Sequence, residues 1–311
     1  AFTLPSAIAL ILFAFGTAAL GGAAGSGWLH GLKVVAVAVV AQAVLGMLRT
    51  LAPDRERATL AVAAAVLVSL STGPWTQLAA IALGAVIGVA VLPGEAHQGH
   101  ATLPLAVSRP AGAMMLLAFF ALLVGLPLLA AAVPSQTVRL VDAFYRAGSL
   151  VFGGGHVVLP LLQAEVVPPG WVSTEAFLAG YGAAQAVPGP LFAFAAYLGA
   201  TAGPEPNGWL GAVICLLAVF LPAFLLTLGA LPFWHALRGQ PLAQAALRGV
   251  NAAVVGLLLA ALYHPVWTAG ITNARDFALG IAAFLLLYIW QVPPWLVVVL
   301  SAIAGAALGA P

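Results

Sequence analysis

Apolar windows of about 20 residues recur along this chain, and each is long enough to cross a lipid bilayer as a helix. Only 6% of the 311 residues are charged, whereas 63% are hydrophobic and the mean hydropathy is +1.12. A soluble domain carries about 25% charged residues, so this chain lacks the polar groups needed to cover a surface in water. The sequence therefore predicts an all-α polytopic membrane protein that passes through the bilayer several times.

Short polar stretches separate the predicted spans. The spans cover residues 1–20, 29–48, 58–72, 75–92, 111–133, 208–231, 245–263, 276–290 and 294–310. The longest polar stretch, 93–110, is interpreted as a linker between two halves. The loop from Arg49 to Arg57 carries three arginines against two acids, and the positive-inside rule places it in the cytoplasm.

Two parts of the chain resemble each other. Leu29-His-Gly-Leu-Lys33 resembles Leu247-Arg-Gly-Val-Asn251, and the glycines at 84 and 88 resemble those at 305 and 309. The similarity predicts a complete membrane repeat over 111–311. It also predicts that 1–92 is the back part of a first repeat whose front part is missing.

Counting spans outward from the cytoplasmic loop places equivalent loops of the two halves on opposite sides of the membrane. The halves are therefore expected to be inverted repeats. This arrangement is characteristic of secondary transporters, which alternate access around a site near the middle of the membrane.

The segment from Phe152 to Gly199 differs from the other spans because glycine and proline break its apolar runs. Its first part begins Phe152-Gly-Gly-Gly-His156, and its second part contains Gln185-Ala-Val-Pro-Gly-Pro190. Irregular backbone at membrane depth is tolerated where it lines a site enclosed by protein. We therefore expect broken or re-entrant helices here, with free backbone N–H groups turned toward a site.

These breaks suit a tetrahedral dianion. Each helix N-terminus carries roughly half a positive elementary charge and up to four unpaired N–H groups. Consecutive glycines let the backbone approach an oxyanion, and Pro-Gly-Pro ends one helix and begins another. The predicted substrate-binding residues are Gly153, Gly154, Gly155, His156, Gln185, Pro188, Gly189, Pro190, Lys33 and Asn251.

Each assignment competes with a structural explanation. The three glycines would also allow close helix packing. His156 is either an oxyanion donor or proton carrier, or an ordinary packed histidine. Gln185 is either a donor for selectivity or part of a helix–helix contact. Lys33 is a functional candidate inside a span, supported by Asn251 at the equivalent position, or it extends to the interface.

The other charged residues have mainly structural interpretations. Glu165 and Glu175 are expected to end the broken helices at the water boundary, with proton coupling as the alternative. Arg139 and Arg146 are expected to anchor at the membrane interface, with attraction of anions as the alternative.

Several other classes of function are disfavoured. A net charge of +2 is too small to indicate nucleic-acid binding, and the lone Cys215 excludes an intramolecular disulfide. Glu95, His97 and His100 fall short of the four ligands of a structural metal site. The sequence has neither a nucleotide-binding P-loop nor a Gly-x-Ser-x-Gly elbow. We expect no enzyme activity and no cofactor, with a membrane enzyme using His156 as the alternative from another class.

The motifs of the broken segment resemble a known family. Phe152-Gly-Gly-Gly-His-Val-Val-Leu-Pro-Leu-Leu162, Glu165-Val-Val-Pro-Pro-Gly-Trp171, Gly180-Tyr-Gly-Ala-Ala-Gln-Ala-Val-Pro-Gly-Pro-Leu191 and Tyr197-Leu-Gly199 are similar to second-half signatures of the chromate ion transporter family. The resemblance covers 111–311 well and 1–92 more loosely, and the first-half motifs of the long members are absent. It implies export of chromate, with sulfate as the related tetrahedral oxyanion.

The sequence thus predicts a secondary active transporter of a bacterial inner membrane that exports chromate and draws on the proton-motive force, with protons as the coupling ion. A transporter or channel for sulfate or another oxyanion is the first alternative. A homodimer is expected to complete the unpaired broken region.

Overall fold

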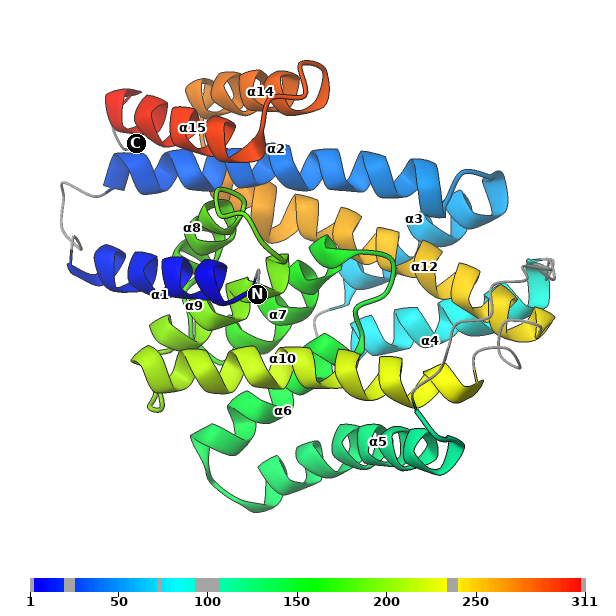
Figure 1. Cartoon of the computed structure of the whole chain (residues 1–311). Coiled ribbons are helices and arrows are strands. Elements are labelled where there is room, and N and C mark those ends of the chain that lie inside the picture. Colours follow the sequence, from blue (N-terminus) through cyan, green and yellow to red (C-terminus); the bar gives the residue numbers. More distant parts are fainter. Residues whose placement is uncertain (1–2, 20–25, 72–73, 93–106, 234–239, 309–311) are drawn as a thin grey trace.

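A computed structural model describes residues 3–19, 26–71, 74–92, 107–233 and 240–308. Within these residues every regular element is a helix (Figure 1). Four helices there are long and apolar enough to cross a membrane: residues 27–51, 109–132, 208–233 and 241–270. The predicted all-α class is confirmed.

The helices lie close to the predicted spans. Before the broken segment they are α1 (Thr3–Ala19), α2 (Ser26–Leu51), α3 (Arg55–Leu70), α4 (Pro74–Val91) and α5 (Arg109–Ala132). After it they are α10 (Gly208–Ala230), η3 (Leu231–Phe233), α12 (Pro241–Ala261), α14 (Ala274–Tyr288) and α15 (Pro294–Leu308). The predicted span 245–263 continues further than expected, because a π-helical turn η4 (Leu262–Trp267) and a short helix α13 (Thr268–Gly270) extend α12.

Short polar side chains begin several of the described helices after loops, with α3 and α14 among them. Asp54 accepts a hydrogen bond from the N–H group of Arg57 at 2.9 Å and begins α3. Asn273 accepts from the N–H groups of Arg275 and Asp276 and begins α14. Such caps satisfy N–H groups that have no partner inside the helix.

Shorter helices pack along α2 and α12 through glycines. A Cβ atom on Gly31 of α2 would collide with the carbonyl oxygen of Ser301 of α15, and one on Gly249 of α12 would collide with that of Gly84 of α4. Figure 1 shows α14 and α15 along α2, and α3 and α4 along α12. Small residues at these crossings let apolar helices approach closely.

Apolar side chains also cover part of the outside. On α5, Leu117, Phe120 and Val124 are 70%, 57% and 62% exposed. Soluble proteins rarely expose a large contiguous apolar patch, whereas in a bilayer these side chains contact lipid. Together with the long apolar helices, this surface identifies a multi-pass membrane protein.

Short helices occupy the region between α5 and α10. They are α6 (Gln136–Ser149), η1 (Gly155–Val157), α7 (Val158–Val166), α8 (Thr174–Ala184), η2 (Leu191–Ala193) and α9 (Phe194–Thr201). The chain is therefore broken where glycine and proline occur, at 150–154 and at 185–190. A turn at 167–173 reverses the chain between α7 and α8.

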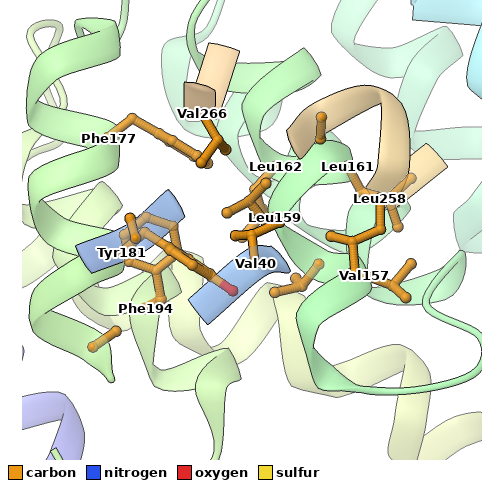
Figure 2. Packing of buried hydrophobic residues seen from close by; sticks show 14 of the residues in the cluster. Val40, Val157, Leu159, Leu161, Leu162, Phe177, Tyr181, Phe194, Leu258 and Val266 are labelled. Carbon is orange, nitrogen blue, oxygen red and sulfur yellow. The ribbon is translucent and has the colours of Figure 1, made fainter. Parts of the chain in front are cut away.

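Helix α7 lies at the centre of the packed core. Leu159 and Leu162 are fully buried, and Figure 2 shows them among Val40 of α2, Tyr181 of α8 and Leu258 of α12. Most side chains of α7 are apolar and buried, as expected for a helix in such an interior. This packing holds the start of α7, and the glycines before it, in a defined position.

Candidate functional site

The two breaks of the chain meet at the starts of η1 and η2. A Cβ atom on Gly155 would lie 3.8 Å from Cβ of Leu191 and, among the described residues, would meet no other heavy atom within 4 Å apart from its own stretch of chain. Gly155 begins η1, which leads directly into α7, and Leu191 begins η2, which leads directly into α9. The first residues of two helical segments therefore lie close together.

These N-termini have no side-chain caps. The residues that precede them, Gly154 and Pro190, have no side-chain acceptor. The first hydrogen-bonded turns are closed by the N–H group of Val157 donating to Gly154 O at 3.3 Å, and that of Ala193 donating to Pro190 O at 2.9 Å. His156 and Phe192 directly precede these donors, and their backbone N–H groups have no partner inside their helices.

The turn before η1 requires glycine at two positions. Gly153 has φ +80° and Gly154 has φ +150° with ψ 162°, and side chains disfavour both conformations. Gly153 faces two other helices, since a Cβ atom there would lie 2.8 Å from Cδ1 of Leu51 and 3.6 Å from Oδ1 of Asn251. Asn251 is thus beside the glycine turn.

His156 follows the glycines and is hydrogen-bonded. Its Nδ1 atom lies 2.8 Å from the hydroxyl oxygen of Tyr181, and Tyr181 is fully buried. This pairing has no signal in the sequence, because the two residues are on different helices. The hydrogen bond fixes the orientation of the imidazole ring next to the break.

The second break contains Gln185 and the Pro-Gly-Pro sequence. Gln185 follows the last residue of α8, and its buried Nε2 atom has no hydrogen-bond partner among the described residues. Pro188 and Gly189 are exposed, and the carbonyl oxygen of Pro188 accepts a hydrogen bond from Oγ of Ser6 at 2.7 Å. An unsatisfied buried amide is a donor that a ligand can use.

Lys33 lies apart from this group. It lines a cavity of about 740 Å³ together with His30, Glu175, Tyr197 and Asn207, and the glycine turn does not line that cavity. Asn251 and Lys33, which are equivalent in the sequence comparison, therefore occupy different surroundings.

A second cavity of about 820 Å³ contains Arg139, Asp142, Arg146 and Glu165. Arg146 donates to Asp142 at 2.8 Å and to Glu165 at 3.1 Å, with its side chain 18% exposed. The guanidinium of Arg146 turns inward to two carboxylates, and its anchoring at the membrane interface stays a prediction. The spacing of four residues between Asp142 and Arg146 is that of an ion pair on a helix, so this pair has a signal in the sequence.

Glu165 lies in the last turn of α7 and Glu175 in the first turn of α8, as expected for residues that end the broken helices. Glu95, His97 and His100 lie outside the described residues. No group of three metal-ligating side chains was found in the part of the chain that the structure describes.

Comparison with known proteins agrees with the resemblance seen in the motifs. The profile of the family described as "Chromate transporter" matches residues 138–306. A probable chromate transport protein of Synechococcus elongatus is 31% identical over 193 residues, which are 58% of this chain and 47% of that protein. A chromate transport protein of Pseudomonas aeruginosa is 35% identical over 171 residues, which are 52% of this chain and 38% of that protein.

A chromate transport protein of Cupriavidus metallidurans is 30% identical over 120 residues, 38% of this chain and 29% of that protein. The chain thus spans less than half the length of these relatives. No solved structure matches the chain. The relatives named here are transport proteins rather than enzymes. Since the family profile covers more than half of the 311 residues, this chain belongs to the chromate transporter family.

Proposed function

We propose that this chain forms a secondary active transporter that exports chromate and binds it between the N-termini of η1 and η2. The observation that carries the proposal is the meeting of Gly155 and Leu191, where two uncapped helix starts face each other. Each contributes roughly half a positive elementary charge and free N–H donors. Such a site attracts a dianion without the full countercharge that would retain it.

The neighbouring residues have distinct roles in this proposal. Gly153, Gly154 and Gly155 expose the backbone donors, and the Pro-Gly-Pro sequence at 188–190 forms the facing break. His156, held by Tyr181, and Gln185, whose Nε2 atom is free of protein partners among the described residues, supply side-chain donors. Asn251 supports the turn from α12. Lys33, in the neighbouring cavity, attracts anions at a distance.

The exposure of the breaks also bears on the proposal. Gly153, Gly154, Pro188 and Gly189 are exposed in the described chain. Non-helical backbone at membrane depth is stable only against protein or water, not against lipid. The breaks therefore require either an aqueous cavity or further protein, and a second copy of the chain is one candidate for that cover.

An inverted-repeat arrangement is part of the proposal. Helices α3 and α4 follow α2 at nearly the same intervals at which α14 and α15 follow α12. The crossings also correspond, since Gly31 of α2 meets α15 and Gly249 of α12 meets α4. These correspondences support two related units, over 1–92 and 111–311, joined by the linker 93–110.

The proposed energy source is the proton-motive force across a bacterial inner membrane. An inside-negative potential contributes about 2.3 kcal/mol per charge per 100 mV, which favours outward movement of a dianion. Sulfate is the alternative substrate, because a site built of backbone N–H groups recognises charge and tetrahedral shape, which the two ions share.

Chromate uptake into everted vesicles tests the proposal, with and without a proton gradient and with sulfate as competitor. We expect gradient-dependent uptake that Gly155→Leu abolishes, because its side chain fills the gap before Leu191. Gly125→Leu on α5 is the matched control, since no heavy atom lies within 4 Å of that Cβ position among the described residues. Equal uptake by the two variants would place the substrate elsewhere, and no uptake by the wild type would refute chromate transport.

A further inference from the structure

Four charged side chains gather in the larger cavity, which lies toward the end of α7 away from the glycine turn. Nη2 of Arg146 donates to Oδ2 of Asp142 at 2.8 Å and to Oε2 of Glu165 at 3.1 Å. Arg139, two turns before Arg146 on α6, lines the same cavity. We refer to these four residues as the charged cluster.

The charged cluster holds two carboxylates on one guanidinium nitrogen. Like charges this close repel each other, and only the shared cation offsets the repulsion. With both carboxylates ionised, the two arginines balance them. One added proton therefore leaves the cluster with a net positive charge and breaks one of the two ion pairs of Arg146.

Arg146 also has unused donor capacity. Its Nε atom is buried and has no hydrogen-bond partner among the described residues. A guanidinium has five N–H donors in a planar fork that matches oxyanions. A cavity of about 820 Å³ in front of it leaves ample space for a small tetrahedral ion.

We propose that the charged cluster is a proton-gated oxyanion subsite, in which a proton on Glu165 frees Arg146 to bind the ion. The inference rests on the proposed function. The proton adds to a carboxylate oxygen of Glu165 and forms the neutral acid, and no other covalent bond changes. When the proton leaves, the ion pair between Arg146 and Glu165 forms again and the oxyanion is released.

The subsite is separate from the break between η1 and η2. Glu165 lies ten residues after Gly155 along η1 and α7, which corresponds to roughly 15 Å along the helix axis. An oxyanion bound at Arg146 is thus too far from the glycine turn to contact it as well. The subsite is a second binding site for the ion along its transport path.

Other groups near the cluster are few. Within the part of the chain that the structure describes, Tyr263 and His264 of η4 are the other titratable side chains lining the cavity. Helices α3 and α4 contribute neutral polar groups, such as Ser69 and Gln77. Because the imidazole of His264 lines the same cavity and is ionisable, the test must separate it from Glu165.

The test measures the affinity of the full chain, reconstituted in lipid, for radiolabelled chromate as a function of pH. We expect wild-type affinity to rise toward tenfold per pH unit as the pH falls across the titration of one linked proton. Glu165→Gln should bind chromate as tightly as the protonated wild type and should lose this pH dependence of the affinity. Chromate itself takes up a proton, so the difference between the two proteins is the readout.

Two controls test whether the effect belongs to Glu165. Glu175→Gln, in the other cavity, and His264→Gln should keep the wild-type pH dependence. Arg146→Gln should lower the affinity at low pH at least about tenfold. If Glu165→Gln does not fold, Asp142→Asn provides the second test. This variant should raise the affinity for chromate, and the affinity should still depend on pH because Glu165 is present.

The outcomes separate the two proposals. Chromate binding with the same pH profile in wild type and Glu165→Gln, or a profile lost in His264→Gln, would overturn the subsite and leave the proposed function intact. A wild type that binds no chromate at any pH would refute the proposed function and the subsite with it.

Discussion

Replacing Gly154 with alanine should weaken chromate binding through backbone strain alone. Gly154 has φ +150° and ψ 162°, a region essentially restricted to glycine. The added methyl group meets no obstacle, because among the described residues no heavy atom lies within 4 Å of the Cβ position apart from the chain neighbours. Strain of this kind costs on the order of 1–3 kcal/mol.

This strain appears in one of two measurements. If the turn relaxes to another shape, the affinity for chromate falls roughly 5- to 150-fold, since about 1.4 kcal/mol corresponds to a factor of ten. If the turn keeps its shape, the free energy of unfolding falls by the same amount. Equilibrium dialysis with labelled chromate and thermal unfolding of the same sample measure both.

Gly125→Ala is the control for this experiment. Gly125 lies inside α5 and also has free space at its Cβ position among the described residues, so the variant should bind normally and be more stable by up to about 1 kcal/mol. If Gly154→Ala matched the wild type in both affinity and stability, the turn would not need glycine, and the reasoning would be refuted.

Three further predictions concern single polar side chains. Tyr181→Phe leaves Nδ1 of His156 without its partner and should lower the free energy of unfolding by about 1–3 kcal/mol; an unchanged unfolding curve would contradict a structural role for the hydroxyl. Gln185→Ala removes a buried donor that has no partner among the described residues, so stability should not fall while the affinity for chromate falls roughly tenfold; a loss of stability with normal binding would make Gln185 a packing residue. The side-chain hydrogen bond from Arg57 holds the pKa of Asp54 below its usual value. The carboxylate therefore stabilises the fold above about pH 4, and this contribution is lost as the pH falls. The difference in free energy of unfolding between wild type and Asp54→Asn should shrink in acid, by less than about 1 kcal/mol. A difference independent of pH would contradict this.

Much of the fold follows from local features of the sequence. The apolar runs predicted the helices, because a backbone in lipid must satisfy its hydrogen bonds within each helix. The breaks were predictable because Gly153 and Gly154 disfavour helix and Pro188 and Pro190 lack N–H donors. The extension of the predicted span 245–263 through Pro265 was not predicted, since a π-helical turn continues the helix past the proline.

The site was less predictable than the fold, because its members come from distant parts of the chain. The pairing of His156 with Tyr181 and the sharing of Arg146 by two carboxylates depend on how separate helices pack. Lys33 and Asn251 have equivalent sequence surroundings, yet Asn251 lies beside the glycine turn and Lys33 in another cavity. Sequence similarity fixed their positions along each helix but not their neighbours.

Locating chromate directly is the sharpest test of the central claim, that two facing helix N-termini bind the oxyanion. Anomalous scattering from chromium in crystals of the protein with chromate would give its position without a variant. We expect a chromium peak within hydrogen-bonding reach of the backbone at Gly155 and Leu191. A structure with chromate bound only elsewhere, and none between these two residues, would contradict it.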